Sequence, residues 1–599
     1  SSVPEVNALL TSWFPNAPKN EQRTVLRTLS QVARDREKNY TGSGTASFIR
    51  QLWLVQDSLP PDWQRRLARL VSEHGEPDEP ERPLFVTGWV SRESPLTDAG
   101  LSQMEPSEIA QYTRSWTPPG GFDSPNRESL AAAIRAEAAK RPDEFAVAAR
   151  LFIDTRAIFV RAVLDGLNDS RSSNLELDWG PILALCEWSV AKRAPPPTDD
   201  DPDGSDDAPW RWVLDSVAQL LHFGRLDHSS PALSEGDRVW AILSVLLSDM
   251  EGGRSGLLSE TPDFVHHSLN STLGKATDAA IWWGIWLTRG VENRPPSDPM
   301  PPPLAVVLRT LLADQTEQSL VARASIGHYL PQLIWMDSDW VESNTELLFP
   351  SLLDSRFSDA VWDSYLRYGQ GGPTPSNYRA LSGQYLAAVE VLDPNSNGTR
   401  PEEGDPRVRL GTHLIVPYLQ GDLEFDGILT SYFDRAPELV RQELLNWLGR
   451  DVRGWQQDDD PPVLRAKAFW EWREKALDDI TDGKTELLTL AWWCASGLFE
   501  PDWIAERLVN ALSQGPATTP YYYNAEDMLD VVVGWDDDYV LTGLTILRHV
   551  VEQREWAHHS PYLGQAAAII RRALSVDRDA AYDDAVHIVD LISRAGHSE

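Results

Sequence analysis

Apolar residues recur along most of this chain at alternating spacings of three and four, the period of an amphipathic α-helix. Apolar–polar alternation, which marks a strand, is best developed in one short segment, Leu84–Val90. The clearest single helical stripe consists of Leu269, Leu273, Ala276, Ala280, Trp283 and Leu287. We predict further helices near residues 20–38, 45–57, 61–73, 126–140, 143–152, 156–167, 178–192, 210–222, 236–249, 303–313, 319–334, 376–392, 407–418, 437–450, 462–477, 485–497, 501–513, 538–555, 562–573 and 578–594. The pattern therefore predicts an all-α chain.

The predicted helices are short and joined by Pro, Gly or Asp turns, which is typical of stacked antiparallel helix pairs. In the segment 303–333, Asp314 lies in the turn and Arg323 lies early in the second helix. Arg409 and Arg441 begin two further helices, and each of the three arginines is followed seven residues later by an apolar residue. Asp in the turn with Arg in the second helix resembles the HEAT-repeat pattern. The resemblance implies an irregular, HEAT-like α-solenoid of antiparallel helix pairs.

Composition shifts divide the chain into four predicted regions. Residues 1–74 form an N-terminal helical unit, and residues 75–125, rich in Pro, Gly and acidic residues, form an irregular connector. Residues 126–392 form a central helical-repeat region, and residues 393–599 form a C-terminal one. The stretches 195–209 and 393–406 have the composition of polar linkers or surface loops.

Charge and cysteine content narrow the classes of partner. The chain of 599 residues has 54 basic and 90 acidic side chains, a net charge of −36, which argues against nucleic acid binding through this chain alone. Its two cysteines, Cys186 and Cys494, are too few for a disulfide framework, and both lie among apolar residues typical of buried thiols. No apolar run reaches the roughly 18–20 residues of a membrane span, and the N-terminus lacks a signal-peptide pattern. We expect a cytoplasmic protein.

Nucleotide and calcium motifs are incomplete. Gly483-Lys484-Thr485 ends like a P-loop, but Asp478 stands where the first glycine is needed, so we expect a connecting turn. The acidic loops at 199–204 and 393–404 open like EF-hand loops but lack the carboxylate at the twelfth position. We expect both to be solvated turns and leave open whether either binds a cation.

An all-helical enzyme is the alternative. Asp199–Asp203 and Asp478–Asp482 match the DDxxD motif of class I terpene synthases, which holds magnesium. The segment 168–176 resembles the companion motif of that family, but it precedes both DDxxD matches, which reverses the family's order of the two motifs. An α/α-toroid carbohydrate enzyme would use aromatic and carboxylate elements such as Trp492-Trp493 and Trp535–Asp538. Core packing explains the tryptophans equally well, and chance matches are expected among so many carboxylates.

The remaining titratable clusters favour structural roles. His266-His267 and His558-His559 are adjacent in sequence, so neither pair can jointly bind zinc from one helix face, and His328 and His413 are expected to be hydrogen-bonded core residues. The arginine clusters Arg65-Arg66-Arg69 and Arg571-Arg572 are expected to be solvated or paired with acids. We therefore predict no catalytic, cofactor-binding or metal-binding residue and no cofactor.

Three stretches, 94–118, 269–280 and 319–340, resemble the long helical regions of large bacterial antiviral-defence proteins. The resemblance implies a scaffold or sensor that recognises a protein partner such as an ATPase or nuclease subunit. The sequence therefore favours a non-enzymatic helical-repeat protein that binds another protein.

Overall fold

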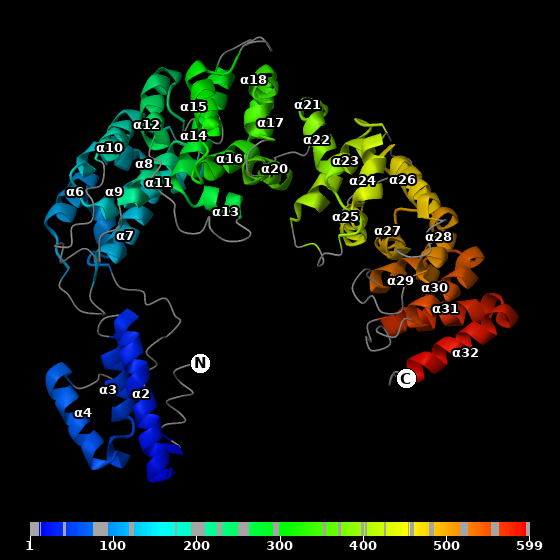
Figure 1. The fold of residues 1–599 in the computed structure, drawn as a ribbon, viewed down its shortest axis with the longest axis horizontal. Helices are drawn as coiled ribbons and strands as arrows, with labels where there is room; N and C mark the ends of the chain where they lie inside the picture. Colours follow the sequence, from blue (N-terminus) through cyan, green and yellow to red (C-terminus); the bar gives the residue numbers. More distant parts are fainter. Residues whose placement is uncertain are drawn as a thin grey trace. The chain divides into compact units, whose positions relative to one another are not determined.

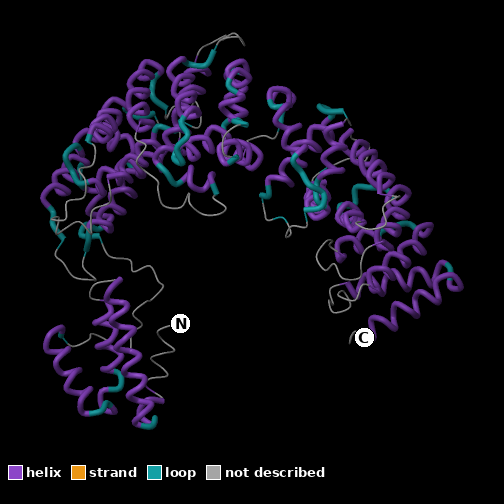
Figure 2. Tube along the Cα trace, viewed as in Figure 1, coloured by secondary structure: helices purple, strands orange, loops and turns teal. Residues whose placement is uncertain are grey.

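The computed structural model describes residues 11, 13–39, 43–75, 94–118, 125–173, 176–192, 210–223, 230–248, 263–290, 299–351, 355–368, 373–396, 401, 404–424, 427–452, 455, 461–477, 484–514, 525–552 and 562–594. Every regular element within these residues is a helix (Figure 2). The prediction of an all-α chain is confirmed for this part. The strand candidate Leu84–Val90 lies outside the described residues.

The chain separates into two compact units, residues 1–92 and residues 93–599. The first unit contains η1 (Phe14–Asn16), α2 (Lys19–Asn39), α3 (Ser43–Trp53), η2 (Gln56–Ser58) and α4 (Pro61–His74). Its core consists of Phe14, Leu26, Phe48, Ile49, Leu52, Val55, Leu59 and Leu67. Arg66 of α4 donates to Ser30 of α2 at 3.0 Å, so a polar contact joins these two helices above the core.

The second unit is a long succession of helices (Figure 1). Its first part contains α5 (Asp98–Gln103), α6 (Pro106–Ser115), α7 (Arg127–Lys140), α8 (Pro142–Ala148), η3 (Ala149–Phe152), α9 (Ala157–Asp169), η4 (Ser170–Ser173), α10 (Trp179–Ala191), α11 (Trp210–Leu220), η5 (Leu233–Glu235), α12 (Gly236–Ser248), α13 (Phe264–Leu269) and α14 (Thr272–Gly290). Its middle part contains α15 (Pro302–Ala313), α16 (Ser319–His328), α17 (Leu330–Met336), α18 (Ser338–Ser343), α19 (Thr345–Leu348), α20 (Arg356–Tyr368), α21 (Pro375–Ala380), α22 (Ser382–Glu390), α23 (Pro406–Gln420), α24 (Gly427–Arg435) and α25 (Glu438–Asp451). Its last part contains α26 (Pro461–Leu477), η7 (Lys484–Thr489), α27 (Leu490–Cys494), α28 (Pro501–Gln514), α29 (Ala525–Val533), η8 (Asp537–Tyr539), α30 (Val540–Glu552), α31 (Leu563–Val576) and α32 (Arg578–Arg594).

Helices of the second unit pack mainly on the helix next but one in the chain. One row of such contacts runs α7–α9–α11–α14–α16–α20–α23–α25–η7–α28–α30–α32. A second row includes the contacts α6–α8–α10–α12, α22–α24 and α27–α29–α31. Neighbours in the chain, such as α10 with α11 and α31 with α32, connect the two rows. Most buried apolar residues of both rows belong to one continuous core, and a smaller separate cluster consists of Phe264, Leu320, Val321, Ala324, Phe357 and Ala360.

The predicted stripe from Leu269 to Leu287 is divided between two helices. Helix α13 ends at Leu269, and Asn270 is its C-terminal cap. The Asn270 side chain donates to the carbonyl of His266 at 2.8 Å. Leu269 is consequently exposed, whereas Leu273 and Trp283 of α14 are buried. Treating all six residues as one stripe was wrong, because periodicity alone does not detect a local cap that restarts the helix.

Two glycines allow helices of the first row to cross closely. A Cβ at Gly327 of α16 would lie 2.1 Å from the carbonyl oxygen of Val361 in α20. A Cβ at Gly166 of α9 would lie 2.5 Å from the carbonyl oxygen of Arg135 in α7. Real Cβ atoms do not approach a backbone oxygen so closely, so these contacts require glycine.

Tryptophans fill the core of the second unit, as large rigid side chains do between helices. Trp470 and Trp493 are among the largest fully buried side chains. Other buried tryptophans are Trp179, Trp283, Trp286, Trp340, Trp362 and Trp535. Exposed ones include Trp212 and Trp335. Most of the described tryptophans are therefore structural rather than part of a recognition surface.

Candidate functional site

Arg323 of α16, the first of the HEAT-like arginines, is completely buried, and its side chain reaches the end of α15. It donates to the carbonyl of Leu312, near the end of α15, and to that of Leu347 in α19 at 2.9 Å. Burial lowers the pKa of Arg323 to about 10. The Asp314 carboxylate instead accepts from the backbone N–H of Thr316 at 2.9 Å. Arg323 thus ties helix ends together through backbone carbonyls.

The second HEAT-like arginine, Arg441, belongs to a buried cluster with Glu486 and Arg473. Glu486 of η7 has no exposed surface and accepts from Arg441 of α25 and Arg473 of α26. Arg441 also donates to the carbonyl of Ala436. One carboxylate between two guanidiniums links three different elements and is enclosed by them, which is a structural arrangement rather than an open anion site.

A buried chain of hydrogen bonds joins α20, α22 and α23. The Tyr365 and Tyr385 hydroxyls are 2.8 Å apart, and the Tyr385 hydroxyl lies 2.9 Å from Nδ1 of His413. Burial, followed by the charge of Arg409, lowers the pKa of His413 to about 4. The imidazole also hydrogen-bonds the backbone at Leu366, so we infer that Nδ1 accepts from Tyr385. The expectation of a hydrogen-bonded core histidine is confirmed for His413.

A second buried polar group centres on Asp278 of α14. Burial raises the pKa of its carboxyl group to about 7, and a hydrogen bond to Ser325 opposes this shift. Nearby, Nε2 of His222 lies 3.2 Å from the Tyr329 hydroxyl. Burial raises the pKa of Tyr329, and the charge of Asp278 adds to that effect. His328 stacks on the Tyr329 ring, and burial lowers its pKa. A carboxyl group of this kind is a candidate acid, but its surroundings are packed core.

Two motifs of the enzyme alternative lie beyond the described residues, the acidic loop 199–204 and the aspartates of 478–482. Gly483 of the P-loop-like segment and the pair His558-His559 lie beyond them as well. In the segment 168–176, Asn168 and Asp169 end α9 and residues 170–173 form η4, so this segment is partly helical. Asp169 pairs with Arg135 at 2.7 Å, which engages the carboxylate that would bind magnesium.

The acidic loop 393–404 is described only in part. The Asp393 carboxylate accepts from the backbone N–H of Asn395 at 3.0 Å, and the Ser396 hydroxyl donates to the Asp393 carbonyl. This is the geometry of a solvated Asx-turn. Residues 397–400, 402 and 403 lie outside the described part.

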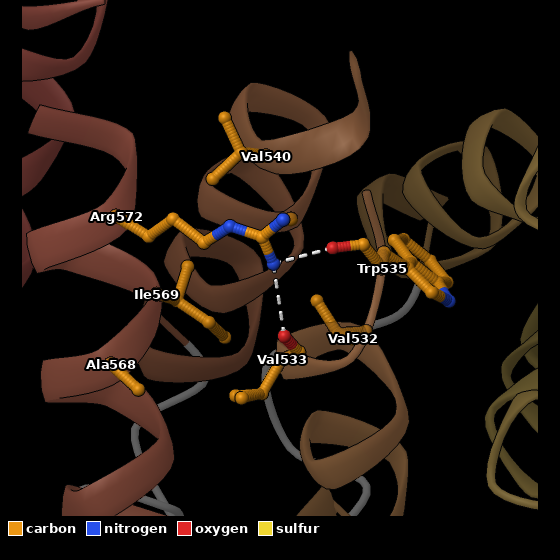
Figure 3. Close-up of a pocket in the computed structure, with 8 residues that line it drawn as sticks. Val532, Val533, Trp535, Val540, Ala568, Ile569 and Arg572 are labelled. Carbon is orange, nitrogen blue, oxygen red and sulfur yellow. Dashed lines mark hydrogen bonds between the residues drawn. The ribbon is translucent and has the colours of Figure 1, made fainter. Parts of the chain in front are cut away.

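Arg572 lines the cavity drawn in Figure 3, a small cavity of about 70 Å³ between α29, α30 and α31. The Arg572 guanidinium donates to Asp537 at 2.8 Å and to the carbonyls of Val533 and Trp535. The other lining residues are mainly apolar. Since Arg572 is committed to these acceptors, the cavity offers no free cation to an anionic ligand. Arg571 is exposed and donates within its own helix.

The other candidates are structural as well. In the N-terminal unit the Arg66 guanidinium lies 4.9 Å from the Trp63 ring centroid, while Arg65 and Arg69 are exposed. Burial raises the pKa of both Cys186 and Cys494 to about 12, which confirms inert buried thiols.

The aromatic elements of the enzyme alternative are part of the core or its edge. Trp493 is buried and donates to the carbonyl of Leu445 at 3.3 Å, and Trp492 lies under the Arg450 guanidinium. Trp535 is buried, and Asp537 pairs with Arg572. Within the part of the chain that the structure describes, no three His, Cys, Asp or Glu side chains gather as a metal site would require. No described helix is both long and apolar enough to cross a bilayer.

An exposed apolar stripe on α32 is the surface feature that sequence reasoning missed. Tyr582, Val586 and Val589 are 53%, 52% and 51% exposed, and their spacing of four and three places them on one side of the helix. The buried side of the same helix consists of Ala581, Ala585 and Ile588. The sequence does contain a signal for the exposed stripe, because its three apolar residues repeat the spacing of the buried ones with a shift of one residue.

No family model matches this sequence, and no curated protein matches it either. The function must therefore be argued from the residues themselves.

Proposed function

We propose that the chain is a non-enzymatic helical-repeat scaffold, an irregular α-solenoid, that binds a protein partner. The observation that carries the proposal is the pattern of helix contacts, in which helices of a row pack on one another and skip one or more helices that lie between them in the chain. Stacked two-helix repeats produce this contact pattern, and solenoids of this kind present extended surfaces to other proteins.

Five polar contacts between helices share a sequence separation of about 35 residues, which supports a repeat in those parts of the chain. Arg135 with Asp169, Arg309 with Asn344, Asn510 with Glu474, Arg548 with Asp584, and Gln565 with Asp530 are separated by 34, 35, 36, 36 and 35 residues. Other contacts have wider separations, such as Ser216 with Asp165 at 51 residues and Thr272 with Asp215 at 57. A repeat of about 35 residues is the length of one helix pair with short turns. It is shorter than the roughly 40–47 residues of HEAT repeats.

The buried titratable groups support a non-enzymatic role. Glu486, Arg473, Arg323 and His413 all bond to other parts of the core. Such groups hold helices together, whereas a catalytic group must also reach a substrate. We place the partner in a prokaryotic antiviral-defence assembly on the resemblance of residues 94–118, 269–280 and 319–340 alone.

Affinity purification of the tagged chain from its native host, followed by size-exclusion chromatography and cross-linking mass spectrometry, tests this function. We expect a stoichiometric protein partner cross-linked to the second unit. A chain that elutes alone, and whose melting temperature rises with magnesium or oligosaccharide, would favour the enzyme alternative.

A further inference from the structure

Helix α32 carries apolar residues on two sides, but only one side is covered by α30 and α31. Ala581, Ala585 and Ile588 form the covered side. The uncovered stripe of Tyr582, Val586 and Val589 has the same spacing, so it offers a second contact surface about two turns long.

Helix α30, the neighbour of α32 in the row, shows how a helix inside the row is covered. It packs on both α28 and α32, and its buried residues Val540, Leu544, Ile546 and Val550 lie within one arc of somewhat less than half its circumference. The exposed stripe of α32 lies about a quarter of a turn around that helix from its own buried residues, and no described helix buries it. Its shape therefore suits a helix rather than an extended peptide.

The acidic residues next to the stripe favour a partner with basic residues. Asp579 and Asp583 are exposed and lie along one edge of the stripe, because each is offset from it by less than a third of a turn. Asp590 lies on the same edge and pairs with Arg594 of the same helix at 2.6 Å. Two copies of this chain pairing through the stripe would bring their aspartates together in one interface, which is unfavourable. A partner with lysine or arginine beside its own apolar residues would pair with that edge. Tyrosine is also a residue type enriched at binding hot spots.

We propose that the Tyr582–Val586–Val589 stripe binds an amphipathic helix of a partner protein, with basic residues flanking the apolar side of that helix. This inference rests on the proposed scaffold function and names the surface and the partner chemistry that serve it. The acidic edge sets the orientation of the helix, and the apolar stripe supplies the affinity.

The test measures binding of a labelled probe peptide to the full-length chain by fluorescence anisotropy. The probe is a helical peptide of about 18 residues, or five turns, with leucines at spacings of four and three and lysines beside them. A peptide of the same composition with the leucines scattered is the control for charge alone. We expect the ordered probe to bind and the scattered one to bind at least about tenfold more weakly.

Val586→Asp should weaken probe binding by at least about tenfold, because a carboxylate would replace a central apolar contact. Leu386→Asp is the matched control, since Leu386 of α22 is 51% exposed on another helix, and it should bind the probe like the unsubstituted chain. The double change Asp579→Lys with Asp583→Lys should shift preference to a probe with glutamates in place of lysines. Equal binding by all variants, or by both peptides, would overturn the proposal.

Other occupants of the stripe give different results. If a second copy covers it, sedimentation will show a dimer that Val586→Asp dissociates, and the probe will not bind. If another part of the chain covers it, Tyr582→Ala will lower the melting temperature more than Leu386→Ala does. If cross-linking shows a stoichiometric partner away from α32, this inference fails while the scaffold function stands; the absence of any partner removes the scaffold function itself.

Discussion

At the residue scale, the charged and hydrogen-bonding groups of the interior are connectors between helices. Glu486 joins α25, α26 and η7, and Arg323 joins the ends of α15 and α19 to α16. A buried ionic group is costly to bring out of water, and its value depends on every partner being present. Single substitutions that leave one partner alone should therefore be much more damaging than those at exposed pairs.

Glu486→Gln should destabilise the second unit by about 3–5 kcal/mol, because it leaves Arg441 and Arg473 buried without their counter-charge. Glu471→Gln is the control: Glu471 pairs with Arg507 near the surface at 3.2 Å, and its loss should cost less than about 1 kcal/mol. Denaturant unfolding followed by tryptophan fluorescence measures both, with Trp470 and Trp493 near the cluster. Equal effects of the two changes would show that the Glu486 cluster does not hold these helices.

His413 should make stability depend on pH in a defined window. Its pKa is lowered to about 4 in the folded chain, against about 6.5 in the unfolded chain, so the unfolded state binds more protons between these values. Stability should therefore fall as pH drops from about 6.5 to about 4. Charged His413 would also lose the hydrogen bond that it accepts from Tyr385, and it would face Arg409.

Thermal melts of the unsubstituted chain and of His413→Gln between pH 4 and pH 7 measure this effect. The variant should be less stable at pH 7 but should lose less stability on acidification. His222, whose pKa is also lowered to about 4, contributes the same sign and remains in both proteins. Parallel pH profiles for the two chains would contradict the assignment to His413.

At the element scale, periodicity predicted most helices, because a helix shows its buried face directly in the sequence. It failed where a local hydrogen bond decides the outcome, as at Asn270, which separates Leu269 from the α14 stripe. It also could not give the partner of a buried side chain: Arg323 was identified by its position, yet its acceptors come from α15 and α19. The α32 stripe was overlooked because Ala581, Ala585 and Ile588 already accounted for an amphipathic helix.

Gly327→Ala should destabilise the crossing of α16 and α20 by about 1–3 kcal/mol, since the added methyl group would meet the Val361 carbonyl oxygen and force the helices apart. Gly383→Ala is the matched control within a helix. A Cβ there meets nothing within 4 Å, so alanine should stabilise α22 by about 0.5–1 kcal/mol. Unfolding midpoints of the two variants should shift in opposite directions. A neutral Gly327→Ala would show that the crossing can open without cost.

At the scale of the whole molecule, two units with separate cores imply more than one unfolding transition. Within the second unit, the proposed solenoid further predicts that the free energy of unfolding differs from one helix pair to the next. A repeat array couples each helix pair only to its neighbours, whereas a globular core of the same size unfolds as one unit. The continuous buried cluster does not by itself distinguish these cases, because a stack of repeats also buries one uninterrupted core.

Hydrogen exchange distinguishes them through two matched cavities at distant points of the row. Ile588 of α32 and Ile134 of α7 are both completely buried, and alanine at either position should cost about 2–5 kcal/mol locally. In a repeat array, Ile588→Ala should speed amide exchange in α30 to α32 and leave α7 to α9 unchanged, and Ile134→Ala should do the reverse. A single cooperative core would instead respond to both variants with the same increase in every helix. That result would remove the helical repeat, and with it the reason to regard the open side of α32 as the place where the next helix binds.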